Sequence, residues 1–193
     1  KLAQKIGETS SALLPPEEKP FDSTMTELVS SAIAEASGAE IVFYSTAGRP
    51  FSIAAGQITF RDICCIEPYE NTIGVIELSP SEIKEIIKEQ FAQKKFKRFL
   101  CPWGVLAKVD KKGNLLGPLL IPGKGGWTDD SIRIKTAFTN YDIAGAGNKF
   151  PFLKKTALSE LSRSFDTGIL VRDAIMRYIS KHSPLDIRRR KYI

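Results

Sequence analysis

The stretch Ser23–Tyr44, STMTELVSSAIAEASGAEIVFY, indicates the fold class because a helix pattern leads directly into a strand pattern. Ser23 or Thr24 can cap the start of the helix, and Gly38 is suited to its C-terminal stop. The helix prediction rests on apolar residues at helical spacing, namely Met25, Leu28, Ala32 and Ile33. The run Glu40–Tyr44 is short, apolar and rich in β-formers, so it predicts a buried strand.

A second strand and helix are predicted over residues 72–91. Thr72–Leu78 is a strand-length run of apolar residues, most of them β-branched. Ser79 is followed three residues later by Glu82, the spacing of a capping box, and Pro80 suits the first turn of a helix. The predicted helix carries one apolar stripe, formed by Ile83, Ile86, Ile87 and Phe91.

The rest of the chain predicts more strands and a terminal helix. The further elements, in chain order, are a short connection at Gly56–Phe60, a helical turn from Arg61 to near Pro68, a hairpin of Val105–Val109 and Leu115–Ile121, a strand at Ser131–Phe138 and a helix at Val171–His182. Together these elements predict a single domain, residues 1–193, of the α/β (α+β) class, with a mixed sheet and flanking helices.

The composition favours a folded domain with a sizeable core. Of the 193 residues, 42% are hydrophobic, and no stretch approaches the ~18 apolar residues that a membrane helix needs, so we expect a soluble chain. The net charge of +6 resides largely in two basic clusters, at residues 94–98 and 188–191. Aromatic side chains, apart from Phe96 and Phe99, do not interleave with these clusters. We therefore interpret both clusters as solvated and do not expect nucleic acid as a partner.

Neither cysteine chemistry nor metal chemistry is indicated. The three cysteines, Cys64, Cys65 and Cys101, form no CxxC pair, and the first two lie in an apolar run where cysteine commonly serves as a small core residue. A two-metal phosphoesterase site draws on several Asp, His and Asn ligands, and the only histidine is His182, which we expect at a solvated helix end. We expect no metal site and no independent hydrolysis in this chain.

Five stretches, specific in combination, carry a resemblance to a known family. They are FDSTMTELVSSAIAEASG (21–38), AEIVFYSTAGRPFSIAAG (39–56), ITFRDICCIEPYENTIGVIEL (58–78), NYDIAGAGNKFPF (140–152) and DTGILVRDAIMRYISKHSP (166–184). In this order they resemble the C-terminal domain of 5'-nucleotidases and UDP-sugar hydrolases, over nearly the whole chain. The resemblance implies a substrate-recognition domain that binds the nucleoside part of nucleotides or nucleotide sugars.

The resemblance also implies a partner and a compartment. In the family a separate N-terminal metallophosphatase domain holds two divalent metal ions and hydrolyses the phosphate ester. A rotation between the domains delivers the substrate to the metals. Relatives are usually exported, which implies a periplasmic or extracellular location. No cofactor is expected in this chain itself.

Matching residue by residue implies six candidate substrate-binding residues: Arg49, Tyr69, Asn148, Tyr141, Asp142 and Tyr44. Arg49 matches the family's loop arginine, whose planar guanidinium suits phosphate. Tyr69 matches an aromatic that stacks on the base, an interaction worth roughly 1–3 kcal/mol. Asn148 occupies the position of the family's ribose-binding Asp.

The other candidates mark departures from the family pattern. Tyr44 falls where the family has Asn, and Asp142 falls where the second stacking Phe is expected. Since Asp142 cannot stack, a sandwich around the base requires Tyr141 or Phe150 to replace that ring. The stretch Gly145–Gly147 is predicted to be a tight turn rather than a phosphate cradle, because no helix begins directly after it.

Alternatives to this interpretation stay open. Arg49 can instead pair with Glu40 or Asp62 on a surface loop, and Tyr69 can be a half-buried aromatic at the edge of the core. The domain can also be a non-catalytic binding or assembly module that kept the fold and lost the nucleotide pocket. A third hypothesis is a polyanion binder that uses the basic clusters, for which binding would depend strongly on salt.

Overall fold

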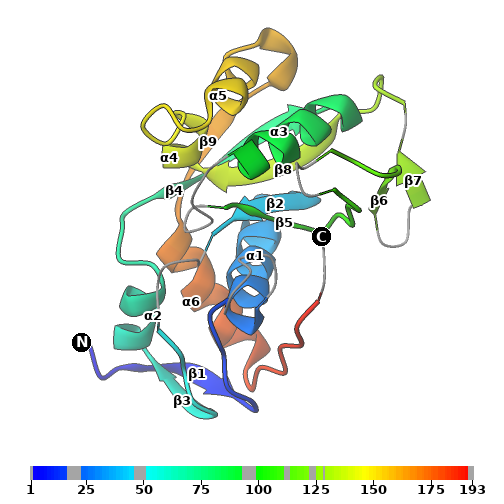
Figure 1. Cartoon of the computed structure of the whole chain (residues 1–193). Helices are drawn as coiled ribbons and strands as arrows, with labels where there is room; N and C mark the ends of the chain where they lie inside the picture. Colours follow the sequence, from blue (N-terminus) through cyan, green and yellow to red (C-terminus); the bar gives the residue numbers. More distant parts are fainter. Residues whose placement is uncertain are drawn as a thin grey trace.

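A five-stranded sheet forms the centre of the fold, in the order β5-β2-β8-β4-β9 (Figure 1). The computed structural model describes residues 2–16, 23–45, 51–92, 99–110, 114–121, 125–127 and 129–190. The strands are β2 Ile41–Tyr44, β4 Thr72–Leu78, β5 Cys101–Trp103, β8 Ile134–Thr139 and β9 Phe165–Leu170. β2 and β8 run parallel, whereas the other neighbouring pairs are antiparallel. The prediction of a mixed sheet is confirmed.

Helices cover both faces of this sheet (Figure 1). On one face lie α1 (Thr24–Ser37), α2 (Phe60–Ile66) and α6 (Val171–His182). On the other lie α3 (Pro80–Ala92), α4 (Asn140–Ile143) and α5 (Pro151–Ala157). The chain therefore forms three layers and buries two hydrophobic cores, one on each side of the sheet.

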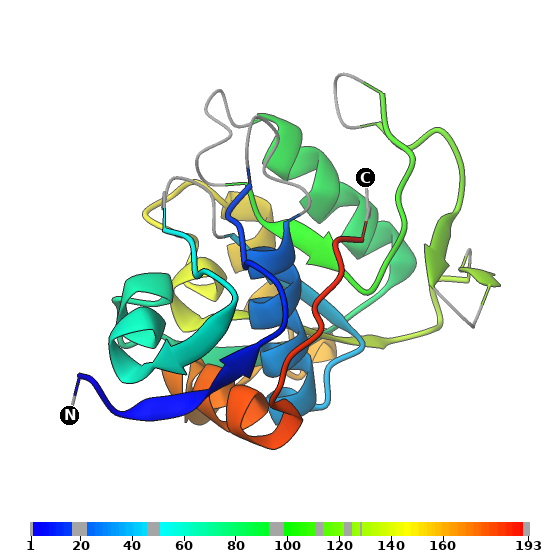
Figure 2. The same ribbon diagram turned by 90° about the horizontal axis from the view of Figure 1, so that it is seen from below.

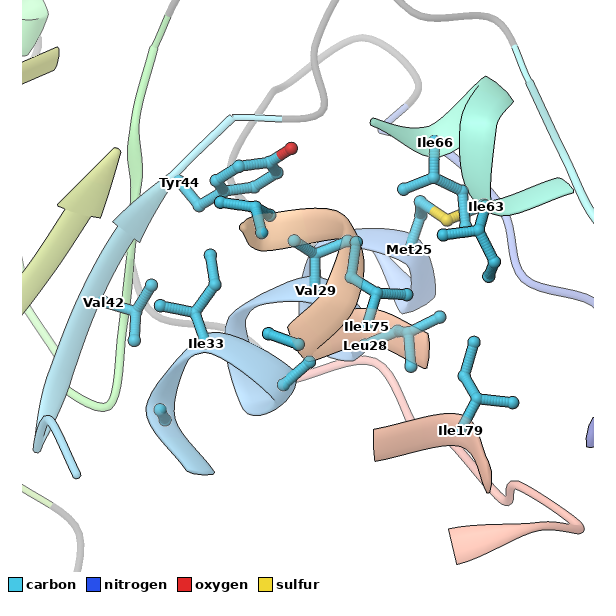
Figure 3. Packing of buried hydrophobic residues seen from close by; sticks show 14 of the residues in the cluster. Met25, Leu28, Val29, Ile33, Val42, Tyr44, Ile63, Ile66, Ile175 and Ile179 are labelled. Carbon is cyan, nitrogen blue, oxygen red and sulfur yellow. The ribbon is translucent and has the colours of Figure 1, made fainter. Parts of the chain in front are cut away.

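Strand β2 supplies both cores because its side chains alternate between the two faces. Val42 and Tyr44 belong to the core under α1 and α6, and Figure 3 shows them facing Ile33 and other apolar side chains of these helices. Ile41 and Phe43 belong to the opposite core, where the Phe43 ring stacks on Phe138 with ring centroids 5.0 Å apart. Both faces of β2 are thus closed to solvent.

The helix ends predicted from local sequence chemistry are confirmed. Ser23 is the N-cap of α1 and accepts the Thr26 N–H at 3.0 Å, and Gly38 ends the helix with a left-handed φ of 67°. The Ser79 N–H donates to Glu82 Oε2 at 2.8 Å, and the Glu82 N–H donates to Ser79 Oγ at 3.2 Å, which completes the capping box before α3. Helix α6 has the predicted bounds.

The prediction of a short connection at residues 56–60 was wrong. Residues Gly56–Thr59 form β3, which pairs antiparallel with β1 (Lys5–Thr9), and α2 begins directly after it. The pattern of β1 is hard to recognise because its two buried residues are Gly7 and Thr9, so the strand lacks regular apolar alternation. The chain after α6 returns to this strand pair, where the Ser10 N–H donates to the Leu185 carbonyl at 2.8 Å (Figure 2).

The second half contains the predicted antiparallel pairing in a reduced form. Isolated bridges join Leu106 to Leu120 and Val109 to Leu115, so the two arms of the hairpin do meet. Residues 119–121 also form β6, which pairs with β7 (Gly125–Trp127). Strands β5 and β9 and the short helices α4 and α5 were not predicted.

The interpretation of Cys64 and Cys65 as core residues was wrong. Cys65 is exposed and Cys64 is half-buried, whereas Cys101 is buried in β5. Helix α2 turns Ile63 and Ile66 toward the core (Figure 3), so the two residues between them lie away from it.

Of the two basic clusters, only residues 188–190 are among those that the structure describes. Residues 94–98 and Lys191 lie outside the described residues. Arg188 pairs with Asp186, and Arg190 Nε lies 3.7 Å from the Glu27 carboxylate. Within the described part of the chain, no helix is long and apolar enough to cross a membrane.

Candidate functional site

Three segments with candidate residues adjoin the same end of the sheet: those that follow β2 and β8 and the one that precedes β4. β2 is parallel to β8, so the segments after Tyr44 and after Thr139 leave at the same end. β4 is antiparallel to β8 and pairs Ile73 with Thr139, so the segment before β4 begins there too. The Thr72 N–H donates to Asn140 Oδ1 at 3.3 Å and joins the last two segments. We call residues 67–71 and 140–150 together the loop end.

A buried carboxylate organises residues 67–71. Glu67 is 0% exposed, and its Oε2 accepts the Tyr44 hydroxyl from the end of β2. Its Oε1 accepts the Tyr69 N–H at 3.2 Å and Asn71 Nδ2 at 3.4 Å. Because a buried carboxylate is costly unless donors surround it, these contacts compensate the loss of hydration and also fix the loop.

A guanidinium holds the same loop from the other side. Arg172, in the first turn of α6, donates from Nε to the Glu67 carbonyl at 3.1 Å. Its Nη2 donates to the carbonyls of Pro68 and Tyr69, each at 3.2 Å. The Tyr69 side chain nevertheless remains 62% exposed, so a tightly held backbone presents an open aromatic ring.

The second part of the loop end begins with a capped turn. The Thr139 hydroxyl donates to Asp142 Oδ2 at 2.6 Å, and the Asp142 N–H donates back to it at 3.1 Å. Asp142 is therefore buried at 7% exposure, while its neighbour Tyr141 is 50% exposed. The fold therefore separates these adjacent residues into a buried carboxylate, bonded to the capping threonine, and a surface ring.

The Gly-rich stretch is a tight turn, as predicted. Four successive residues have left-handed φ angles: Gly145 (94°), Ala146 (47°), Gly147 (67°) and Asn148 (67°). The N–H groups of Lys149 and Phe150 close the turn on the Gly145 carbonyl, at 2.8 and 3.2 Å. The Tyr141 hydroxyl lies beside the turn, 3.7 Å from where a Cβ on Gly147 would stand.

Glu89 of α3 fixes the helix that follows this turn. Its carboxylate accepts the Phe152 N–H at 2.6 Å and the Leu153 N–H at 3.3 Å, at the start of α5. Burial raises the pKa of the Glu89 carboxyl above its ordinary value, and these two N–H groups partly offset that effect. The turn is therefore held between α4 and an anchored α5.

The six candidate residues have different surroundings. Tyr69, Tyr141 and Asn148 are exposed at the loop end. Tyr44 (2% exposed) and Asp142 point into the protein, and Arg49 lies outside the described residues. Phe150 is 1% exposed within the core, so it cannot replace the second stacking ring.

Sequence reasoning missed two residues of this region, Glu67 and Arg172. The available signal for Glu67 was a charged side chain directly before a Pro-aromatic pair, between an apolar run and a strand. No local signal marked Arg172, because the carbonyls that it binds lie more than 100 residues earlier in the chain.

The only histidine lies away from the loop end. His182, expected to be an ordinary solvated helix terminus, contacts Glu35 of α1 at 2.7 Å and the ring of Tyr178. Hydrogen bonds from His182 and from Lys181 lower the pKa of the Glu35 carboxyl. Among the residues that the structure describes, no group of three or more His, Cys, Asp or Glu side chains gathers as a metal site would.

Comparison with known proteins identifies the family. A family model described as "5'-nucleotidase, C-terminal domain" matches residues 5–155. The chain belongs to this family. This C-terminal domain is 27% identical over 168 residues to the protein UshA of Yersinia enterocolitica, a match that covers 86% of the chain and 29% of UshA.

A second UshA, from Escherichia coli K12, is 26% identical over 188 residues, which cover 96% of the chain and 32% of that protein. The chain thus spans about a third of the length of the curated relatives that it matches. These relatives extend the resemblance over most of the C-terminal domain.

Solved structures share the fold. A 5'-nucleotidase precursor from Thermus thermophilus has a TM-score of 0.79 at 21% identity and covers 96% of this chain, which corresponds to 38% of that chain. The NAD nucleotidase of Haemophilus influenzae has a TM-score of 0.78 at 19% identity over 97% of this chain and 37% of that chain. The predicted 5'-nucleotidase C-terminal fold is confirmed.

Proposed function

We propose that this C-terminal domain recognises the nucleoside part of nucleotides or nucleotide sugars. The observation that carries the proposal is the pair of exposed rings, Tyr69 and Tyr141, on two segments that meet at one end of the sheet. Exposed tyrosines offer flat apolar faces to a base, and their hydroxyls can contact water or polar groups of the ligand. The names of similar proteins, 5'-nucleotidase and NAD nucleotidase, support a nucleotide as the ligand class.

The other candidate residues take supporting roles in this proposal. Asn148 follows the tight turn and offers an amide to the sugar hydroxyls, and Arg49 supplies a guanidinium to the phosphate. Tyr44 and Asp142 support the site from inside the protein, because Tyr44 ties β2 to Glu67 and Asp142 accepts the hydroxyl of Thr139, which caps the turn that carries Tyr141.

Bond cleavage belongs to another part of the enzyme in this proposal. A separate N-terminal domain with two divalent metal ions hydrolyses the phosphate ester, and this C-terminal domain presents the substrate to it. Such ions would activate a water and neutralise charge on the phosphate. We further propose a periplasmic or extracellular location, on the basis of the family resemblance.

Calorimetric titration of the 193-residue chain with AMP, UMP, adenosine and UDP-glucose tests the recognition role. We expect weak binding in the wild type and a loss of about 5- to 150-fold in Tyr69→Ala, which corresponds to roughly 1–3 kcal/mol of stacking. Tyr69→Phe should retain most of the affinity because the ring face remains. Leu158→Ala, at a side chain 78% exposed outside the loop end, is the matched control.

Two outcomes would contradict recognition by these rings. Heats that stay flat up to millimolar concentrations of every ligand would exclude a nucleoside site of useful affinity. Equal affinities of Tyr69→Ala and Leu158→Ala would show that the bound ligand does not stack on Tyr69.

A second candidate is a non-catalytic binding or assembly module that kept the fold and lost the pocket. The burial of Tyr44 and Asp142 favours it, because these two side chains at family binding positions are engaged inside the protein. This candidate predicts that calorimetric titration with any of the four ligands gives no heat of binding, although the chain is stably folded.

A further inference from the structure

An exposed ring binds a base well only if its backbone is already in place. Tyr69 lies in the five-residue segment between α2 and β4 and is 62% exposed, so most of its ring faces solvent. A mobile ring would lose conformational freedom on binding, and this loss would reduce the affinity. The affinity therefore depends on the residues that fix segment 67–71.

The buried carboxylate of Glu67 fixes the N–H side of the segment. It accepts the N–H of Tyr69 itself and the amide of Asn71, so the residue that carries the ring is held on both sides. The Tyr44 hydroxyl also donates to it, from the last residue of β2. The carboxylate thus links the segment to the central sheet.

The guanidinium of Arg172 fixes the carbonyl side. Its nitrogens donate to three successive carbonyls, of residues 67, 68 and 69, at 3.1 to 3.2 Å. A planar guanidinium can serve several acceptors at once, whereas an ammonium is a point charge on a flexible stem. Arg172 lies in the first turn of a helix that packs in the core, and the Val171 N–H donates to the Asn71 carbonyl at 2.9 Å.

We infer that Glu67 and Arg172 are positioning residues of the nucleoside site, an inference that rests on the proposed function. Neither touches the ligand. One serves the N–H groups and the other the carbonyls of the same segment, and together they hold Tyr69 in the orientation that stacks on a base. Tyr44 assists through Glu67, so the unusual tyrosine at this family position supports the site from inside the core.

The test compares Arg172→Lys with Arg177→Lys, a matched change at an exposed arginine on the same helix. We expect Arg172→Lys to weaken AMP and adenosine binding by about tenfold, equally for both ligands because a base contact is lost. Amide hydrogen exchange at Tyr69, whose N–H is bonded to Glu67, should accelerate by about tenfold, since the segment opens more often. Arg177→Lys should leave both measurements unchanged.

A double-mutant cycle separates positioning from general stability. In a Tyr69→Ala background the ring is absent, so Arg172→Lys should cause no further loss of affinity. A merely structural role would reduce affinity by the same factor in both backgrounds and would overturn the inference. Tyr44→Phe provides a second probe, with faster exchange at Tyr69 expected even if Arg172→Lys does not fold.

The outcomes distinguish the inference from the proposed function. If the wild type binds none of the nucleotides or nucleosides, the proposed function fails and the positioning role for it fails with it. If the wild type binds but Arg172→Lys and Tyr44→Phe match Arg177→Lys in affinity and exchange, only the positioning inference is overturned.

Discussion

Replacing Gly104 with alanine should destabilise the domain strongly, because two independent costs meet at this residue. Gly104 follows edge strand β5 and has a φ of 86°, a left-handed conformation that L side chains rarely adopt. A Cβ there would also overlap the carbonyl oxygen of Glu40, well inside the 3.0 Å that real Cβ contacts respect. That oxygen belongs to backbone just before β2, so it cannot move aside as a flexible side chain would.

The magnitude follows from adding the two terms. A left-handed conformation costs about 1–2 kcal/mol for a residue with a Cβ. Overpacking against a fixed group costs about 1–3 kcal/mol more. We therefore expect Gly104→Ala to lower the free energy of unfolding by about 2–5 kcal/mol, a large part of the stability of an ordinary domain.

Two other glycines in the chain provide matched controls. Gly38→Ala has the conformational cost alone, since φ is 67° but nothing lies within 4 Å of the new Cβ. Gly117→Ala has neither cost and should be neutral or slightly stabilising, because alanine reduces the entropy of the unfolded chain. Urea unfolding of the wild type and the three variants, followed by circular dichroism, measures the order. A loss in Gly104→Ala no greater than that in Gly38→Ala would refute the reasoning.

Three further predictions concern charges and the buried tyrosine. Burial raises the pKa of Glu89, so its contribution to stability is fully present below the ordinary value of 4.5 and is lost as pH rises through the folded pKa. Urea unfolding should therefore show the free energy of unfolding of Glu89→Gln rising relative to that of the wild type between about pH 4 and pH 7. Hydrogen bonds from His182 and the adjacent lysine lower the pKa of Glu35, so its contribution is present above 4.5 and is lost as pH falls through the folded pKa. Solvent screening keeps this contribution under about 1 kcal/mol, and Glu35→Gln should cost less at about pH 3 than at pH 7 and less in high salt. Tyr44→Phe removes a donor from the buried Glu67 carboxylate and should cost about 1–3 kcal/mol in the same assay.

The elements that could be predicted from the sequence are those with local chemistry at their ends. Ser23 and Gly38 marked both ends of α1, and the Ser79–Glu82 box marked the start of α3. β4 was recognisable because it is buried on both faces and carries a nearly continuous apolar run. In these segments the local preference and the tertiary environment agree.

The elements that could not be predicted depend on partners far away in the chain. β9 is mostly exposed or half-buried, begins with Phe165 at 51% exposure and contains Gly168 with a φ of 70°. Its strand conformation comes from pairing with β4, about 90 residues earlier. β1 likewise depends on β3, so neither strand has a period that a sequence pattern would reveal.

The candidate site, too, has a part that could be predicted from the sequence and a part that could not. The family resemblance indicated the loops of Tyr69 and Tyr141, and both rings are exposed. It could not indicate what holds these loops, because the donors to Glu67 come from β2 and from its own loop, and Arg172 comes from the last helix. Buried polar contacts of this kind depend on the assembled tertiary structure, so they produce no recognisable residue spacing in the sequence.

The departures from the family pattern therefore have a structural meaning that position alone did not suggest. Tyr44 stands where the resemblance implies an asparagine, yet its ring lies in the core between β2 and α1, and its hydroxyl donates to the carboxylate that holds the Tyr69 loop. Asp142 stands where the resemblance implies an aromatic, yet its carboxylate accepts the hydroxyl of Thr139, the residue that caps the turn carrying Tyr141. Under the proposed function, each of these two residues forgoes a ligand contact and supports a neighbouring exposed ring instead.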